Sequence, residues 1–289
     1  MRRTTFLVIF AALVVGAFAQ QLKLPNKPDS LHFAVIGDTG TGGRPEYEIA
    51  AKVAEFRKVF PFDFVVMMGD NMYGGQKPKD YQKKFEEPYK TLLNAGVKFY
   101  AVLGNHDDTN QRSYKLFNMG GERYFTFKPR EGVRFFGLDS NYMDKRQLEW
   151  FENELAQSGS AWKIVFFHHP LYSSGATHGS DLQLRSVLEP LFAKYAVNLV
   201  LSGHDHFYER IKPQKGIQYF VIGGSAKLRE GNARGAEFTA KSFDADNSFA
   251  LMEIDQDTLH YQAISRTGQT VDSGFFQRPA APKKISENR

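Results

Sequence analysis

The sequence contains no cysteine among its 289 residues. Disulfides, thiolate metal ligands and a lipid-modified cysteine anchor are therefore excluded for this chain. A large excess of charge of one sign is also missing, because the net charge is only +5 and the lysines are scattered along the chain. Such a distribution is typical of a solvated surface and does not indicate a nucleic-acid partner. Without disulfides, the fold must depend on its apolar core and on any metal that it binds.

Long apolar runs are missing apart from one at the start of the chain. Residues 6–19 are apolar, but this run is shorter than the ~20 residues that span a bilayer. It follows the basic pair Arg2-Arg3 and ends on Ala17-Phe18-Ala19, the small-x-small pattern of a cleavage site. We therefore predict a signal peptide at residues 1–19, with an uncleaved anchor as the alternative. The mature protein is expected to be secreted or periplasmic and to have no membrane attachment.

Segments typical of strands and helices alternate through the first two thirds of the chain. Short apolar runs bounded by Gly or polar residues indicate buried strands. Residues 46–59 and 81–93 have apolar side chains at helical spacing and lie between the first three strands. Further helices are predicted from Asp144, with Gln147 placed as in a capping box, and at 181–195. This order predicts an α/β fold with a parallel sheet and right-handed crossovers.

The C-terminal part of the chain lacks long helical segments. Three strands are predicted there, at 218–222, 249–254 and 259–265. We expect them to form the antiparallel portion of a second sheet. Residues 20–28 and 278–289 are polar, contain Pro or Lys, and are expected to be loose ends. Because no linker is evident, residues 20–289 are predicted to form a single domain.

Five of the predicted strands share one feature, which is that residues able to bind metals follow each of them. They are 33–36 with Asp38, 64–68 with Asp70, 99–103 with Asn105 and His106, 164–167 with His168, and 197–201 with His204 and His206. Ligands of open sheets bind beyond the carboxyl ends of the strands. The pattern therefore predicts that two Asp, one Asn and three of the His meet at one edge of one sheet. That is too many ligands for one tetrahedral ion and suits two metals that share a carboxylate.

These motifs differ in how specific they are. Gly37-Asp38 alone is a common turn, whereas Gly69-Asp70 repeats the same placement and is followed by Tyr73. Gly104-Asn105-His106 is specific, because Asn is a poor metal ligand by charge and its place beside His in a turn after a strand is unusual without a purpose. An Asn/Asp-rich turn is its alternative interpretation. Gly203-His204-Asp205-His206 is the most specific, because two His separated by one residue in a tight turn can face two different ions.

Taken together, the motifs resemble the signature of the calcineurin-like metallophosphoesterases. The segment Gly69-Asp70-Asn71-Met72-Tyr73 narrows the resemblance to the purple acid phosphatases, especially the small type similar to tartrate-resistant acid phosphatase. His168-His169-Pro170-Leu171-Tyr172-Ser173 fits the same family. The resemblance covers nearly all of the chain after residue 19. It implies a four-layer αββα sandwich, with two mixed β-sheets and a metal site at one edge of the packed sheets.

The resemblance also implies a set of ligands for each ion. One ion would be held by Asp38, Tyr73 and His206, the other by Asn105, His168 and His204, and Asp70 would bridge the two. Phenolate and carboxylate oxygens favour a hard trivalent ion, whereas neutral Asn and His suit a borderline divalent ion. The implied cofactor is therefore Fe(III) plus a divalent metal (Fe, Zn or Mn). Tyr73 bound to Fe(III) would colour the protein. The alternative is that Tyr73 is a wall residue of the pocket, and in that role it would give no colour.

Such a centre would hydrolyse phosphate monoesters by attack of a metal-bound hydroxide, and the trivalent ion would allow this at acidic pH. His106 follows a ligand Asn, and we expect it at the mouth of the pocket, where it would contact phosphate and protonate the leaving group. His178 is a second candidate for these roles. The alternative, which has equal weight, is that His178 is a solvent-exposed loop residue without a role in the site. His169 is expected to point to the opposite face of its strand. Asp107 and Asp205 are expected to orient ligands or backbone.

The predicted function is an exported acid phosphatase, a metal-dependent phosphoric monoester hydrolase that acts as a monomer on small phosphorylated substrates. A phosphodiesterase or a nucleotide phosphatase on the same centre is the alternative. A non-catalytic exported protein that binds iron or phosphate is a third hypothesis, and the complete ligand set argues against it. The loop at 226–248 contains Gly, Lys and Arg and is a candidate for shaping substrate choice.

Overall fold

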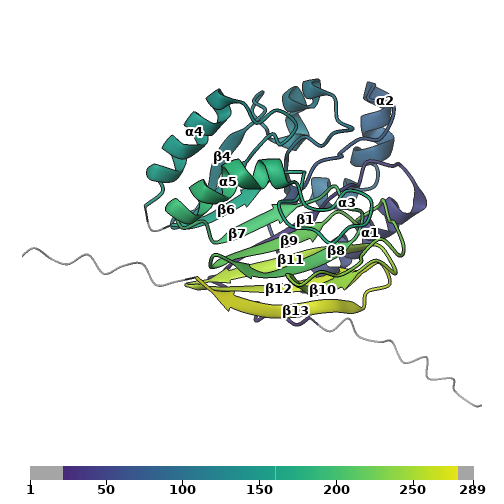
Figure 1. The fold of residues 1–289 in the computed structure, drawn as a ribbon. Coiled ribbons are helices and arrows are strands. Elements are labelled where there is room, and N and C mark those ends of the chain that lie inside the picture. The colour runs from purple at the N-terminus through teal and green to yellow at the C-terminus, as the bar shows by residue number, and fades with distance from the viewer. Residues whose placement is uncertain (1–21, 160, 279–289) are drawn as a thin grey trace, which may run out of the picture.

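The computed structural model describes residues 22–159 and 161–278, which form two β-sheets packed face to face with helices on their outer faces (Figure 1). The predicted signal peptide and residues 279–289 lie outside the described residues. Among the helices of the described part, none is both long enough and apolar enough to cross a membrane.

The first sheet has six strands in the order β13-β12-β11-β1-β2-β3. Their bounds are β1 Leu31–Ile36, β2 Phe64–Met67, β3 Lys98–Ala101, β11 Ser248–Asp255, β12 Thr258–Ser265 and β13 Thr270–Gln277. Strands β1, β2 and β3 are parallel, whereas β11 pairs antiparallel with β1, and β12 and β13 continue antiparallel. The carboxyl ends of β1, β2 and β3 therefore lie at the same edge of this sheet.

The second sheet has seven strands in the order β10-β8-β9-β7-β6-β5-β4. Their bounds are β4 Phe125–Arg130, β5 Val133–Gly137, β6 Trp162–Phe166, β7 Leu199–Ser202, β8 Tyr208–Gln214, β9 Ile217–Ile222 and β10 Thr239–Phe243. The run from β5 through β6 and β7 to β9 is parallel. Strands β4, β8 and β10 pair antiparallel with their neighbours, so this sheet is mixed like the first.

Helices cover the outer face of each sheet. The longer ones are α1 Arg44–Arg57, α4 Lys145–Ala156 and α5 Leu182–Lys194, and the shorter segments are α2 Pro78–Tyr81, the π-helical η1 Gln82–Glu86, α3 Lys90–Asn94, and the 3-10 helices η2 Thr109–Ser113 and η3 Lys115–Phe117. The predicted cap at Asp144 is present, because its side chain accepts a hydrogen bond from the Gln147 N–H, and Asp181 likewise caps α5 by accepting one from the Leu184 N–H.

Three apolar cores separate four layers. In the first, Ile49, Val53 and Phe56 of α1 pack on the outer face of the first sheet. The second, the inter-sheet core, contains Phe33, Val66, Phe135 and Ile164 from the facing sides of both sheets. In the third, Phe151 of α4 and Leu188 of α5 pack on the outer face of the second sheet. The architecture is therefore the αββα sandwich that the resemblance implied.

The assignment of strands to sheets differs from the sequence prediction. The five strands that precede the candidate ligands do not share one sheet, because β1, β2 and β3 belong to the first sheet and β6 and β7 to the second. The strands predicted at 249–254 and 259–265 join β1 in the first sheet, and the one at 218–222 pairs parallel with β7. An apolar run specifies that a strand is buried, but its partner depends on contacts far along the chain, so the pattern could not assign the sheet.

The predicted helix at 81–93 is also wrong as a continuous element. The structure divides this segment into α2, η1 and α3. The break between η1 and α3 contains Pro88, which has no N–H to donate and whose ring clashes with the preceding turn of a helix. Helical spacing of the apolar residues persists across the break because all of these pieces face the same core.

Several further features were not foreseen. Strands β4, β8, β10 and β13 went unrecognised because they are partly exposed and polar, and β10 lies within the expected loop at 226–248. The described part of the expected loose N-terminal end is held in place. The Lys23 N–H donates to Gln262, and the Asn26 and Lys27 N–H groups donate to Glu253.

Candidate metal centre

The carboxyl ends of five strands meet at one edge of the packed sheets. The loops after β1, β2 and β3 carry Asp38, Asp70, Tyr73, Asn105 and His106, and the loops after β6 and β7 carry His168, His204 and His206. Residues that are distant in the sequence thus become neighbours. The structure brings together all seven residues that the sequence analysis named as ligands, as the following distances show.

The first group of candidate ligands consists of Asp38, Asp70 and His206, whose ligand atoms all lie within 4.8 Å of one another. All three side chains are buried. The Tyr73 hydroxyl donates to Asp38 Oδ1 at 3.1 Å and lies 3.2 Å from His206 Nε2. The phenol oxygen is therefore a fourth candidate ligand atom in this group.

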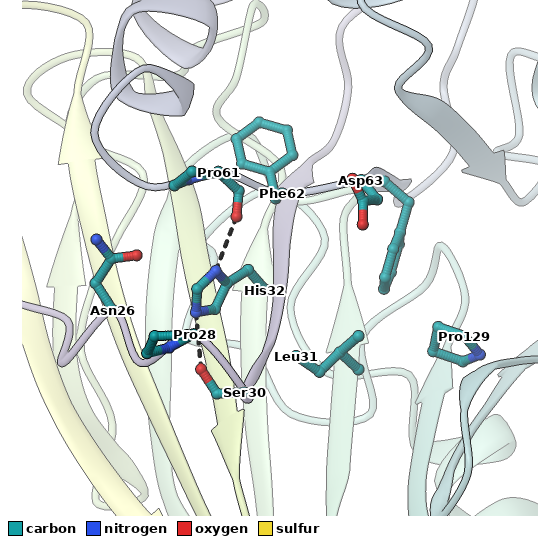
Figure 2. Close-up of a pocket in the computed structure, with 10 residues that line it drawn as sticks. Asn26, Pro28, Ser30, Leu31, His32, Pro61, Phe62, Asp63 and Pro129 are labelled. Atoms are coloured by element: carbon teal, nitrogen blue, oxygen red, sulfur yellow. Dashed lines mark hydrogen bonds between the residues drawn. The ribbon is translucent and has the colours of Figure 1, made fainter.

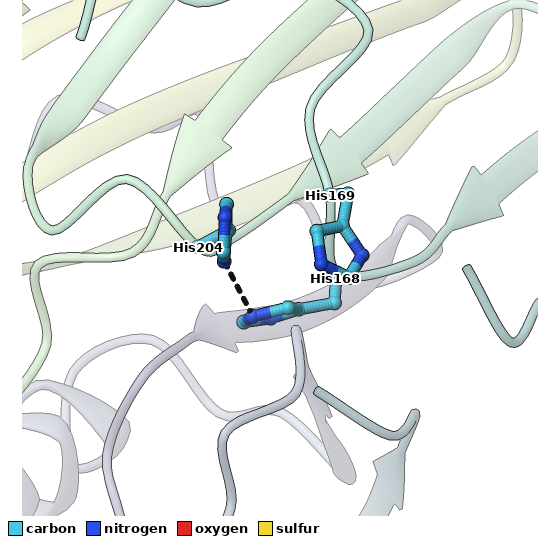
Figure 3. A group of neighbouring side chains, drawn as sticks. All are labelled: His168, His169 and His204. Atoms are coloured by element: carbon cyan, nitrogen blue, oxygen red, sulfur yellow. Dashed lines mark hydrogen bonds between the residues drawn. The ribbon is translucent and has the colours of Figure 1, made fainter. Parts of the chain in front are cut away.

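The second group is centred on the buried His168. Its Nε2 atom lies 3.0 Å from Asn105 Oδ1 and 3.1 Å from His204 Nδ1. Figure 3 shows His168 and His204 turned toward each other, with His169 beside them. His168, His169 and His204 also satisfy the geometry of a metal-binding group, with ligand atoms within 4.8 Å of one another.

Asp70 lies between the two groups. It belongs to the first group, and its Oδ1 atom is 3.5 Å from His168 Nε2 in the second. In these two groups, Asp70 is the residue whose carboxylate lies close to candidate ligand atoms of both. A carboxylate in this position is placed to bind two cations at once.

The backbone around the groups is arranged by turns that few residues adopt. Asp38, Asp70 and His204 have positive φ angles of 55°, 49° and 67°. Such left-handed conformations are uncommon outside Gly and cluster at functional sites. At Gly104 any side chain is excluded, because a Cβ atom would lie 2.2 Å from Asp70 Oδ1. These constraints fix the carboxylates before any ion binds.

Two further carboxylates hold the loops in place, as the sequence analysis expected. Asp107 accepts hydrogen bonds from the backbone N–H groups of Asn71, Met72 and Gly104, and so fastens the loop after β2 to the loop after β3. Burial is the main cause that raises the pKa of Asp107 to about 7. Asp205 accepts from the Ser173 hydroxyl and the Gly179 N–H, which fixes the loop that carries His178.

The candidate ligand atoms present lone pairs that suit a cation. His168 Nδ1 lies 2.9 Å from the Met68 carbonyl, so it carries the proton and leaves Nε2 as an acceptor. That Nε2 atom faces the oxygens of Asn105 and Asp70, which are acceptors as well. A metal ion satisfies lone pairs that converge in this way.

The electrostatics of the metal-free groups lead to the same conclusion. Burial, followed by the charge of Asp70, raises the pKa of Asp38 well above its usual range. Burial also lowers the pKa of His168 well below its usual range and that of His206 to about 3. These two imidazoles are therefore neutral and free to act as ligands, and the Asp38 carboxylate needs nearby positive charge to remain ionised.

The two His predicted to contact substrate both lie beside the groups. The His106 N–H donates to Asp70 Oδ1 at 3.0 Å, and its exposed ring lies 4.9 Å from the Tyr73 ring. The His178 ring is 4.1 Å from the His204 ring. Arg229 Nη1 is 2.6 Å from His178 Nε2, and burial together with this guanidinium lowers the pKa of His178.

One expectation about the neighbouring His was wrong. His169 does not point away from the site: its ring lies 4.4 Å from that of His204, and its Nδ1 atom is 2.8 Å from Ser140 Oγ. The alternation of side chains applies within a strand, but β6 ends at Phe166, so His168 and His169 lie in the loop beyond it.

Two cations near the centre were not singled out as site residues. Lys227 lies over the Tyr73 ring, with Nζ 4.7 Å from the ring centroid, and its N–H donates to the Asp38 carbonyl. The Arg229 N–H donates to the His206 carbonyl. The only sequence signal was that both belong to the Lys- and Arg-containing loop at 226–248.

Comparison with known families gives one match that covers more than half of the chain. Residues 31–208 match the family model described as calcineurin-like phosphoesterase. Purple acid phosphatase 3 of Arabidopsis thaliana is 28% identical over 262 residues, which cover 78% of this chain and 71% of that protein. Human tartrate-resistant acid phosphatase type 5 is 24% identical, covering 91% of this chain and 97% of that protein.

Solved structures share the fold at lower identity. The structure titled "GAP50 the anchor in the inner membrane complex of Plasmodium" has a TM-score of 0.76 and 20% identity, and covers 86% of this chain and 89% of that chain. Purple acid phosphatase PPD1 from yellow lupin has a TM-score of 0.70 and 19% identity, and covers 89% of this chain and 55% of that chain. Likeness at this level concerns the fold alone.

Proposed function

Because the chain belongs to the calcineurin-like phosphoesterase family and is therefore a hydrolase of phosphate esters, we propose that it is an exported acid phosphatase for monoesters with a dinuclear Fe(III)–M(II) centre. The observation that carries the proposal is the position of Asp70 between two groups of ligands. The fold alone would not suffice, since one similar structure is described as an anchor.

The donor atoms divide between a hard and a softer site. Asp38, Tyr73 and His206 would hold Fe(III), because two of these three ligands are anionic oxygens when bound. The other three proposed ligands, Asn105, His168 and His204, would hold Fe(II), Zn(II) or Mn(II). When bound, the ions would neutralise charge on the phosphate and activate water for in-line attack on phosphorus.

The chain's own groups would bind the phosphate and move the proton. The exposed His106 ring beside Tyr73 is placed to donate to a phosphate oxygen and to protonate the leaving alcohol. Arg229 donates to His178 Nε2, so the neutral ring carries its proton on Nδ1. That proton is available to a phosphate oxygen, which favours a binding role for His178 over an acid role.

Positive charge at the entrance would favour the phosphate dianion. Lys227 is exposed above the Tyr73 ring, and Arg229 lies next to His178. Two cations near the proposed metal site would raise the local concentration of anions. Both residues follow β9, so the loop at 226–248 would contribute to phosphate binding.

The test combines metal analysis, spectroscopy and turnover. Purified protein is expected to contain two metal ions per chain, one of them iron, and to absorb visible light. It should hydrolyse a chromogenic monoester faster than the matching diester, with a maximum at acidic pH. A preference for the diester would favour the alternative phosphodiesterase, and metal-loaded protein inactive on both esters would contradict an enzymatic role.

A further inference from the structure

A cavity of about 580 Å³ lies directly beside the candidate metal centre. Asn105 and His169 form its wall on the side of the centre. The rest is formed by residues 140–143, which follow β5, and by residues at the start of α5. An ester whose phosphate is bound at the centre could therefore extend its alcohol part into this space. The argument rests on the proposed function, because it concerns the substrate of that same site.

A second cavity provides a contrast at the opposite edge of the first sheet. It has a volume of about 470 Å³ and lies where β1 and β2 begin, far along both strands from Asp38 and Asp70 (Figure 2). Both ring nitrogens of its His32 are already engaged, at 2.8 Å from Ser30 Oγ and 2.8 Å from the Pro61 carbonyl. Its position excludes it from contact with a phosphate at the centre.

The cavity beside the centre has a largely polar wall, and the described residues that line it include no Lys or Arg. Its wall contains the amides of Asn141 and Gln183 and the hydroxyls of Ser140 and Tyr142, and neither Lys nor Arg belongs to it. Its one carboxylate, Asp181, accepts the hydrogen bond that caps α5. A leaving group with further phosphate or carboxylate groups would meet no Lys or Arg among these lining residues, and the nearby Arg123 is already paired with Asp139 and Asp144. The lining therefore favours an uncharged alcohol that has hydrogen-bonding groups.

The same cavity has an exposed apolar rim. The Tyr142 side chain is 64% exposed and that of Val187 is 39% exposed, and both line the cavity. Leu182, between two lining residues, is 61% exposed. Large apolar side chains gathered at the surface beside a pocket are typical of a ligand-binding site. An exposed phenol ring in particular offers a face on which a planar ring can stack.

The rim is held in a fixed position. Gln147 Nε2 donates to the Tyr142 carbonyl, and the Arg123 guanidinium lies 5.7 Å from the centre of the Tyr142 ring. Arg123 is itself fixed by ion pairs with Asp139 and Asp144. A ring positioned before the ligand arrives loses less entropy on binding, so this arrangement suits recognition.

From these observations we infer that the cavity binds the alcohol part of the substrate and selects an uncharged, ring-containing group such as a nucleoside. Tyr142 stacks on the ring, and the Gln183 amide binds its polar edge. The Asn141 Nδ2 group is already engaged with the Leu103 and Gly104 carbonyls, so Asn141 offers only its amide oxygen. The phosphate faces the cations Lys227 and Arg229, outside this cavity. The two ends of one substrate are thus sorted by charge, with the anionic end toward the basic loop and the neutral end toward the cavity.

The first experiment measures binding without turnover. Adenosine, which lacks phosphate, is titrated into the metal-loaded protein by calorimetry. We expect saturable binding that Tyr142→Ala weakens roughly tenfold, the scale of one ring stacking on an aromatic side chain. Val187→Trp should weaken it as well by filling the cavity. Tyr47→Ala removes an exposed tyrosine of α1 that does not line the cavity, and should leave the affinity unchanged.

The second experiment compares kcat/KM for adenosine 5′-monophosphate and glycerol phosphate in the same proteins. Tyr142→Ala and Val187→Trp should lower the value for the nucleotide roughly tenfold, mainly through KM, and leave that for glycerol phosphate unchanged. The inference would be overturned by equal kcat/KM values for the two substrates in all variants, or by adenosine binding that neither substitution weakens. In either case, hydrolysis of glycerol phosphate would still support the proposed phosphatase. Failure to hydrolyse either ester would instead contradict the proposed function.

Discussion

The two sheets contribute different chemistry to the candidate metal centre. The loops of the first sheet supply every oxygen donor among the proposed ligands, namely Asp38, Asp70, Tyr73 and Asn105. The loops of the second sheet supply every nitrogen donor, namely His168, His204 and His206. Each proposed ion takes donors of both kinds. Neither sheet can therefore complete a site alone, and a bound ion would link the two sheets.

The sheets are also joined at this edge by hydrogen bonds. His168 Nδ1 lies 2.9 Å from the carbonyl of Met68, which follows β2, and the His204 N–H donates to Asp38 Oδ2 at 3.0 Å. The centre is therefore a property of the inter-sheet packing. Its rigidity comes from the buried inter-sheet core, and any change that separates the sheets should separate the ligands too.

Removing the shared oxygen donor should have the largest effect. We predict that Asp70→Ala loses both ions, because this carboxylate contacts both groups, and that activity falls roughly 10³-fold or more. Metal content per chain and kcat are the measurements. Asp63→Ala, an exposed position at the other end of β2, is the matched control. A variant that kept two ions per chain would disprove the bridging role.

Removing the ions should weaken the link between the sheets. Ligands bound a thousandfold above their Kd stabilise the folded state by about 4 kcal/mol. Chelation is therefore expected to lower Tm by roughly 8–16 °C for a domain of this size. Scanning calorimetry with and without a chelator measures the shift, and restored metal should reverse it. An unchanged Tm on removal of measured metal would show that the ions do not connect the sheets.

Removing a side chain that binds no metal should separate catalysis from metal binding. We predict that His106→Ala lowers kcat roughly 10²-fold while the protein keeps both ions, because its ring is exposed at the centre and is assigned proton transfer. His260→Ala, on β12 of the same sheet, serves as the control. Loss of metal from the His106 variant would mean that this residue is a ligand.

Changing one oxygen donor of the first sheet should give the smallest loss of activity and the clearest spectroscopic change. We predict that Tyr73→Phe abolishes visible absorption and lowers activity by about tenfold or less, since the ring and its packing remain. Tyr47→Phe, which removes an exposed hydroxyl of α1, should keep the colour. An unchanged spectrum in the Tyr73 variant would assign this residue to the wall of the pocket.

Much of the site could be predicted because its signals are local. Each ligand follows an apolar run within a few residues, so Asp38, Asp70 and His204 were recognisable from their own segments. The cap at Asp144 is equally local. His169, Lys227 and the cavity at Tyr142 carry no such signal. Their roles depend on neighbours from other loops, which no short pattern describes.

Most of the buried strands, the longer helices and the chemical types of the proposed ligands follow from the sequence alone. Apolar spacing, caps and the turn after each strand are short-range properties, and the chain encodes them within a few residues. The tertiary structure decided which strands share a sheet and that oxygen donors face nitrogen donors across two sheets. Those outcomes depend on burying both faces of each sheet at once, so they follow from contacts between segments far apart in the sequence.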